Sequence, residues 1–110
     1  MTVDEISRKA HETIEKSIEH YGKELQSIVC MEECAELIQA ISKIQRKGLN
    51  DELKNHLAEE IADVMICIRM LRMMYGITPE DVSKWIDYKI ERKAENMKCG
   101  KKLPIEDKNV

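Results

Sequence analysis

The sequence is poor in the residues that build or interrupt β-structure. Its 110 residues include only four glycines and two prolines, and phenylalanine is absent. No run alternates between apolar and polar residues. β-Branched residues are mostly isoleucines at helical spacing, which disfavours strands. The glycines at positions 22, 48, 76 and 100 separate segments of helical composition. The sequence therefore predicts an all-α bundle of about four helices, over roughly residues 3–20, 23–47, 51–75 and 79–97.

Helix-capping residues stand where three of these helices are expected to begin. Thr2 and Glu5 have the spacing of a capping box, and Asn50 precedes a pair of acidic residues. Thr78 is followed by Pro79 and two further acids, which places proline at the first helical position. Such residues accept hydrogen bonds from the free N–H groups of a first turn.

The chain also lacks an excess of positive charge and a long apolar run. Its 18 Lys and Arg against 21 Asp and Glu give a net charge of −3, which argues against a nucleic-acid partner. The most apolar stretch, residues 57–74, is interrupted by five charged residues and cannot cross a membrane. The N-terminus has no apolar segment typical of a secretory signal, so export is not expected.

The four cysteines lack the spacing of a zinc site, because no C-x-x-C pair is present. Cys30 and Cys34 are four residues apart in an expected helix, and Cys67 lies within an apolar one. Buried free thiols are placed in this way, whereas small secreted proteins use cysteines as disulfide scaffolds. We therefore expect reduced thiols in a cytoplasmic protein.

Composition changes towards the C-terminus. From residue 98 the chain is polar and contains Gly100 and Pro104, so we expect an all-α domain over residues 1–97 and a mobile tail over 98–110. The third helix is apolar nearly all round its surface. A lone four-helix chain would leave part of that surface in water, which predicts a homo-oligomer, either a dimer or a tetramer.

Two pairs of acidic residues stand in apolar surroundings on the second and third helices. Glu33 and Glu36 are three residues apart in VCMEECAELIQAI, and Glu60 and Asp63 have the same spacing in HLAEEIADVMICI. This spacing places each pair on one face of its helix. Glu36 lies about 12 residues before the expected turn and Glu60 about 10 after it, so antiparallel helices would bring the pairs level.

Four carboxylates that face one another repel, and protons, basic partners or divalent cations could neutralise them. A solvated acidic face with salt bridges is one alternative. A di-iron carboxylate protein is another, although it requires Glu-x-x-His on two helices and this pattern is absent. A site with oxygen ligands alone suits Mg²⁺ or Mn²⁺.

The segments that contain these two acidic pairs resemble a known family. The two acidic pairs, in EECAELIQAISK and EEIADVMI, are similar to the signature of the MazG-like all-α nucleoside triphosphate pyrophosphohydrolases. The resemblance covers roughly Gln26 to Arg92. It implies Mg²⁺-dependent cleavage of a nucleoside triphosphate to the monophosphate and pyrophosphate, with subunits that associate. It further implies that Glu33, Glu36, Glu60 and Asp63 hold the metal and carry out catalysis, in a nucleotide house-cleaning role.

Other residues are candidates for contacts with the substrate. Lys43 lies two helical turns beyond Glu36 on the same face, where it could meet phosphates. Lys89 and Arg92 resemble basic residues on the last helix of the family, although the long basic run found there is missing. The side-chain amide of Gln26 could hydrogen-bond to the edge of the nucleotide base, and the ring of Trp85 could stack on that base. For this single tryptophan, however, packing in the core is the stronger expectation. A non-catalytic dimerisation or adaptor module remains the main alternative function.

Overall fold

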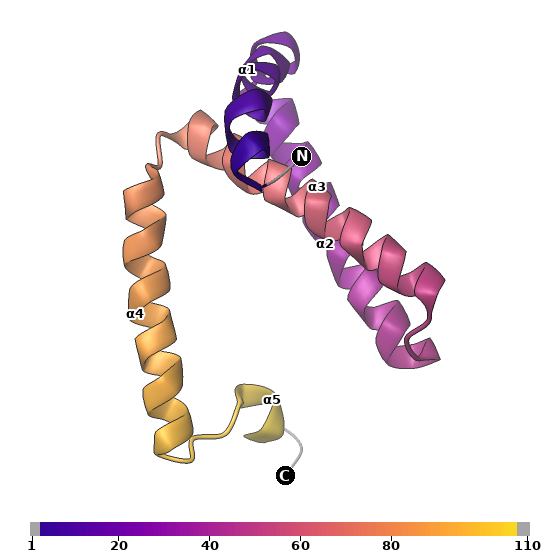
Figure 1. The fold of residues 1–110 in the computed structure, drawn as a ribbon, viewed down its shortest axis with the longest axis vertical. Helices are drawn as coiled ribbons and strands as arrows, with labels where there is room; N and C mark the ends of the chain where they lie inside the picture. The colour runs from indigo at the N-terminus through magenta and orange to yellow at the C-terminus, as the bar shows by residue number, and fades with distance from the viewer. Residues whose placement is uncertain (1–2, 108–110) are drawn as a thin grey trace. The chain divides into compact units, whose positions relative to one another are not determined.

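The helices begin and end close to the positions that the glycines predict. The computed structural model describes the backbone of residues 3–107 and the side chains of residues 8–106. The helices are α1 (Val3–Tyr21), α2 (Lys23–Lys47), α3 (Asp51–Tyr75), α4 (Pro79–Lys98) and the short α5 (Pro104–Asp107) (Figure 1). The described residues contain no strand, so the predicted all-α fold is confirmed.

Two of the predicted helix caps are present. The Asn50 side chain accepts a hydrogen bond from the Leu53 N–H at 2.8 Å, at the start of α3. At the start of α4, the Thr78 hydroxyl accepts from the Asp81 N–H at 3.1 Å, and the Asp81 carboxylate accepts from the Thr78 N–H at 2.9 Å. The capping box expected over residues 2–5 lies outside the described residues.

Gly76 ends α3 and also marks a division of the chain. Its φ of 66° is left-handed, a conformation that glycine adopts without the steric cost of a Cβ. The chain then forms two compact units, Met1–Gly76 and Ile77–Val110. The proposed boundary between a domain at 1–97 and a mobile tail at 98–110 stays a prediction; within that tail the structure has α5.

The first unit is an antiparallel hairpin of α2 and α3, with α1 packed across one end of it (Figure 1). Its core consists of Ile14 from α1, Cys30 from α2, and Cys67 and Met70 from α3. The Cys30 thiol donates to the Cys67 carbonyl oxygen at 3.7 Å. All four cysteines are free thiols, as the sequence predicts.

This core is small, and much apolar surface of the hairpin stays exposed. Met31 and Ile38 on α2 are 65% and 67% exposed. The other large apolar residues exposed on the two helices are Leu25, Ile28, Val29, Ile41, Ile61, Met65, Ile66, Ile68 and Tyr75. So many exposed apolar side chains on two helices favour a protein–protein interface.

The second unit has no buried residue on its main helix, α4. Trp85 is 61% exposed, and its ring meets the Tyr88 ring edge-on at 5.8 Å between centroids. The expected packing of Trp85 in a core is therefore not found within the second unit, whose main helix has no buried residue. No helix among the described residues carries an apolar stretch long enough to span a membrane.

Candidate metal centre

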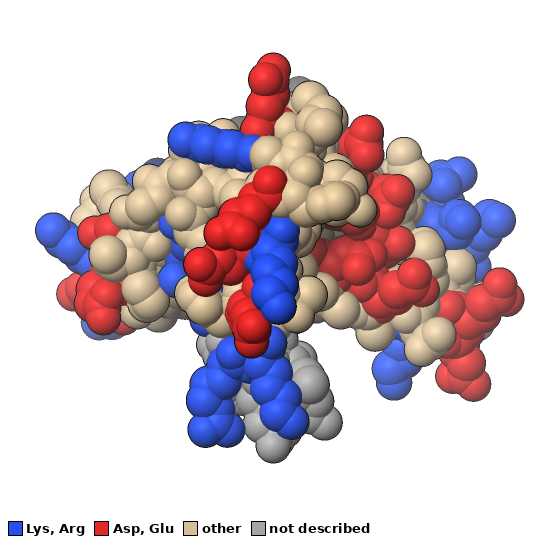
Figure 2. Space-filling view, turned by 90° about the horizontal axis from the view of Figure 1, so that it is seen from above, with Lys and Arg blue, Asp and Glu red and all other residues tan. Residues whose placement is uncertain are grey.

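The middle of the α2–α3 hairpin brings four carboxylates together. Glu33 and Glu36 come from α2, and Glu60 and Asp63 come from α3. One oxygen from each side chain lies within 4.8 Å of those of the other three. Figure 2 shows acidic side chains gathered over this hairpin, on the right of the view. The convergence that the spacing predicts is therefore observed.

The register of the hairpin explains this convergence. The turn at residues 48–50 reverses the chain, and Asn50 fixes where α3 begins. On α3 the residues buried against the other helices are Glu60, Cys67 and Met70, a helical repeat of seven and three. Glu60 therefore occupies a position on the same face as the core residues, where an apolar side chain would ordinarily lie.

Two of the carboxylates are poorly satisfied. Glu60 is only 4% exposed, and Glu33 is half-buried. The Oε2 atoms of Glu33 and Glu60 are buried and have no hydrogen-bond partner among the described residues. A buried carboxylate oxygen without a partner is costly, because it has lost its water and gained nothing in exchange. The cluster is thus incomplete as an internal hydrogen-bonding network.

The same surroundings oppose ionisation. The pKa of Glu60 is raised from its usual value, first by burial and then by the negative charges of Glu36 and Asp63, with His56 acting in the opposite direction. The pKa of Glu33 is raised as well, by burial, by Glu36 and by Asp63. A cation placed among these oxygens would offset the cost of burying their negative charge and would reduce the repulsion between them.

The described residues offer little neutralisation of their own. His56 Nε2 lies 3.8 Å from Glu60 Oε1, and no Lys or Arg among the described residues forms an ion pair with the cluster. A solvated face with salt bridges therefore does not describe it. No histidine belongs to the cluster either, so the Glu-x-x-His pattern of a di-iron site does not fit. Four carboxylates are a donor set that fits a hard divalent cation.

A cavity of about 320 Å³ opens further along the hairpin from the cluster, towards the turn. Lys43 lines it together with Arg46 and His56. Arg46 and His56 were not among the candidate site residues that the sequence indicated. The spacing held a signal for both, because Arg46 follows Lys43 by three residues and His56 precedes Glu60 by four.

The remaining candidates are distributed over the chain. Gln26 is 5% exposed, and its amide nitrogen donates to the Ser17 hydroxyl at 2.7 Å and to the Ser17 carbonyl at 3.3 Å. Gln26 therefore ties α2 to α1. Lys89, Arg92 and Trp85 all belong to α4, in the second unit.

Comparison with known protein families identifies the class of protein. The family model for the MazG nucleotide pyrophosphohydrolase domain matches residues 22–98, which include all four carboxylates. The chain belongs to this family, whose domain is that of a hydrolase of the nucleotide pyrophosphohydrolase type. Neither the comparison with curated proteins nor that with solved structures found a match.

Proposed function

We propose that the protein is a Mg²⁺-dependent nucleoside triphosphate pyrophosphohydrolase that yields a nucleoside monophosphate and pyrophosphate. The observation that carries the proposal is the cluster of four convergent carboxylates, two of which hold buried oxygens without partners. A triphosphate is itself strongly anionic, so an acidic site can accept it only together with cations. Mn²⁺ has the same ligand preferences and is expected to substitute for Mg²⁺.

In this proposal Glu33, Glu36, Glu60 and Asp63 hold the metal. A bound Mg²⁺ would neutralise the carboxylates and attract the phosphate oxygens of the substrate. One carboxylate of the cluster accepts a proton from the attacking water. The oxygen of that water bonds to phosphorus as the bond between the α- and β-phosphates breaks, so that the monophosphate and pyrophosphate leave.

In the same proposal, basic residues bind the phosphates of the substrate, and two further residues contact its base. Lys43 is the phosphate contact nearest the carboxylates along α2, and Arg46 stands beside it in the same cavity. Lys89 and Arg92 on α4 supply further positive charge. Trp85 has an exposed ring on which a base can stack. Gln26 is buried and its amide nitrogen donates to Ser17, so its carbonyl oxygen is the atom left for a contact with the base.

The activity is tested by the release of pyrophosphate from a panel of ribo- and deoxyribonucleoside triphosphates. With Mg²⁺ we expect release from at least one of them, together with the matching monophosphate, and no release in EDTA. Activity on none of the panel would favour the non-catalytic dimerisation or adaptor module instead. Nucleotide house-cleaning predicts the highest rate on a non-standard nucleotide, and a cytoplasmic location rests on the four free thiols.

We further propose that the protein is a homo-oligomer, a dimer or a tetramer, formed through the exposed apolar surface of α2 and α3. Light scattering at micromolar concentration is expected to give at least twice the 12.8 kDa of one chain. Ile38→Glu should shift the mass towards the monomer, because it places a charge in the buried interface. Gln45→Glu, an exposed polar position on the same helix, is the matched control and should leave the mass unchanged. A wild-type monomer would contradict the proposal.

A further inference from the structure

Three of the four free thiols lie close together in the first unit. Cys30 on α2 and Cys67 on α3 are both buried in its core. The Cys30 thiol donates to the Cys67 carbonyl oxygen at 3.7 Å, and a hydrogen bond also joins the two side chains. Cys34 is exposed and follows Cys30 by four residues, so it lies on the same face of α2. The hairpin thus sets two thiols face to face across its helices, with a third thiol beside them.

A cavity of about 310 Å³ gives access to one thiol of the buried pair. Its lining is mostly apolar and includes Cys30 and Cys34, together with Met31 and Leu71. Cys67 is not among the residues that line it. A small uncharged molecule can therefore reach the sulfur of Cys30, whereas that of Cys67 is shielded from the cavity.

Helix geometry decides which of these thiols can pair. A disulfide needs Cβ atoms about 3.5–4.5 Å apart, whereas residues four apart on one helix have Cβ atoms about 5–6 Å apart. Cys30 and Cys34 therefore cannot be joined while α2 stays helical. Cys30 and Cys67 stand on different helices, and a hydrogen bond already holds their side chains together. Cys67 is therefore the partner that the fold offers to Cys30.

We propose that Cys30 and Cys67 form a redox-sensitive lock, in which a hydroperoxide converts the two thiols into a disulfide that joins α2 to α3. The Cys30 sulfur attacks one oxygen of the hydroperoxide and the O–O bond breaks. Cys30 becomes a sulfenic acid, and water or an alcohol leaves with its proton. The Cys67 sulfur then attacks the Cys30 sulfur, and the sulfenic hydroxyl leaves as water with the Cys67 proton. Two thiols are thereby oxidised and one hydroperoxide is reduced.

The surroundings of Cys67 keep the pair reduced until an oxidant arrives. The pKa of the Cys67 thiol is raised to about 12, first by burial and then by its hydrogen bond with Cys30. A protonated thiol is a weak nucleophile, so Cys67 attacks only after Cys30 has become an electrophilic sulfenic acid. Disulfides of this kind in a reducing compartment are usually transient and sense oxidants.

The lock lies about one helical turn from the carboxylate cluster. Cys30 precedes Glu33 by three residues, and Cys67 follows Asp63 by four. A disulfide at this level fixes α2 and α3 to each other and closes a loop over residues 30–67, which includes the hairpin turn. Such a loop restricts the unfolded chain. The oxidised first unit should therefore melt at a higher temperature and exchange the amide hydrogens of its hairpin more slowly.

The test uses the full chain with Cys34→Ser/Cys99→Ser, which changes only exposed positions and leaves Cys30 and Cys67 as the only thiols. After treatment with hydrogen peroxide under native conditions, we expect the loss of two hydrogens per chain and a digest in which the peptides of Cys30 and Cys67 are linked. The melting temperature should rise by at least about 5 °C and should return to its starting value with dithiothreitol. The wild type should give the same linked peptides.

The matched control is Cys30→Ser/Cys34→Ser/Cys99→Ser, which keeps Cys67 alone and should show neither the loss of hydrogens nor the rise in melting temperature. Three outcomes would each overturn the proposal. Cys30 and Cys67 could stay unlinked while Cys34 and Cys99 of the wild type are fully oxidised, Cys30 could pair with Cys34 or with a second chain, or the linked form could melt no higher than the reduced one. None of these measurements depends on whether the protein hydrolyses nucleotides.

Discussion

The two units of the chain place carboxyl groups in opposite surroundings. In the first unit the acids are gathered on the face that also carries the core, and the pKa of Glu60 is raised, mainly by burial. In the second unit α4 buries no side chain, and the pKa of Asp81 is lowered, mainly by its backbone hydrogen bond with Thr78. The same functional group is thus disfavoured as an ion in one unit and favoured in the other.

This difference decides which ligands each unit can take. Two carboxylates of the hairpin hold buried oxygens without a hydrogen-bond partner among the described residues, so a cation is needed to complete the cluster. The Lys and Arg side chains near the C-terminal end of α4 form no ion pair among the described residues either, but they stand exposed in water, so their charges cost less. An absent ligand should therefore weaken the fold of the first unit and leave that of the second almost unchanged.

The largest expected effect comes from one substitution made in each unit. Asp63→Asn removes a charge from the cluster, and Asp87→Asn makes the same change on exposed α4. Release of pyrophosphate should fall by at least about 100-fold for Asp63→Asn, because a lost ligand misplaces the metal and the substrate. Asp87→Asn should keep full activity.

The same pair of variants also separates function from stability. Without metal, Asp63→Asn should be as stable as the wild type or more stable by about 1 kcal/mol, since one like-charge repulsion is removed. The apo melting temperature measures this. An Asp63→Asn protein that is fully active and melts as the wild type does would refute the metal role of Asp63.

Addition of metal should give the next largest effect. A cation that binds only the folded protein raises its free energy of unfolding. For Mg²⁺ at about 100 times its dissociation constant, the increase is about 2.7 kcal/mol. The melting temperature of the wild type should therefore rise with Mg²⁺ or Mn²⁺, whereas Glu36→Gln/Asp63→Asn should show little rise. A rise of equal size in that double variant would place the cation elsewhere.

Removal of a helix cap should have a smaller effect, which differs between the units. Asn50→Ala and Thr78→Ala each remove a side-chain acceptor worth about 1 kcal/mol to its helix. Asn50→Ala should lower the melting temperature of the first unit, because α3 carries core residues. Thr78→Ala should instead speed amide hydrogen exchange in the first turns of α4 and leave the melting of the first unit unchanged. Equal effects on melting would mean that the two units unfold together.

The sequence predicted the helices well because the residues that begin and end them act locally. These residues are the glycines at positions 22, 48 and 76 and the caps at Asn50 and Thr78, and each acts within a few residues along the chain. The convergence of the carboxylates was predictable too, because it follows from helical spacing and the position of one turn. Their assignment as metal ligands still rests on family membership and on the donor set.

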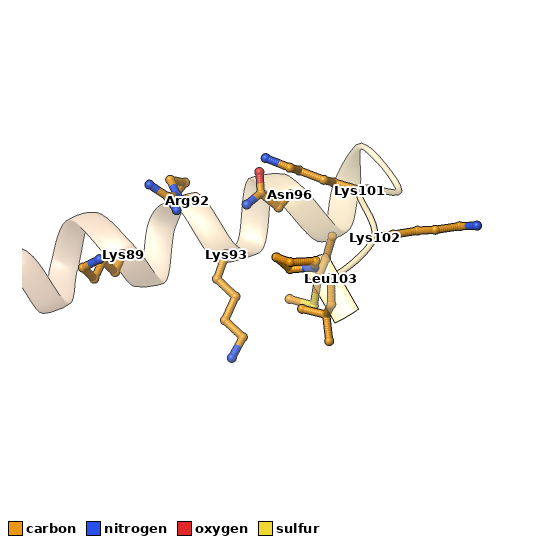
Figure 3. Close-up of a pocket in the computed structure, with 9 residues that line it drawn as sticks. Lys89, Arg92, Lys93, Asn96, Lys101, Lys102 and Leu103 are labelled. Atoms are coloured by element: carbon orange, nitrogen blue, oxygen red, sulfur yellow. The ribbon is translucent and has the colours of Figure 1, made fainter. Parts of the chain in front are cut away.

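Contacts between distant parts of the chain were not predictable in this way. Nothing in the spacing indicates that the Gln26 amide donates to Ser17, since this contact depends on how α1 crosses α2. Trp85 was expected in a core because tryptophan is large and apolar, but the second unit forms no core around α4. The cavity of about 600 Å³ between the C-terminal half of α4 and the segment after it (Figure 3) was not predictable either, because it depends on the chain folding back after α4.

The smallest expected effect is a difference in how stability depends on pH. A carboxyl whose pKa is raised on folding binds its proton more tightly in the folded state than in the unfolded state. It therefore contributes stability below its unfolded value, 4.5 for Glu60, and this stability is lost as pH rises through the folded pKa. Asp81 has a lowered pKa, so it contributes stability above 3.8 that is lost as pH falls through the folded pKa.

Two variants measured in EDTA isolate these contributions from the rest of the titration. The melting temperature of Glu60→Gln minus that of the wild type should increase as pH rises above 4.5 and then level off, because only the wild type must ionise a buried carboxyl. For Asp81→Asn, exchange in α4 should exceed that of the wild type at neutral pH, and the two should approach each other as pH falls below 3.8. Mg²⁺ should reverse the first difference at high pH, because a neutral amide at this position cannot replace a carboxylate ligand, and should leave the second unchanged. A Glu60→Gln difference that does not vary with pH would show that burial at this position does not oppose the charge, and the case for a cation in the hairpin would lose its electrostatic basis.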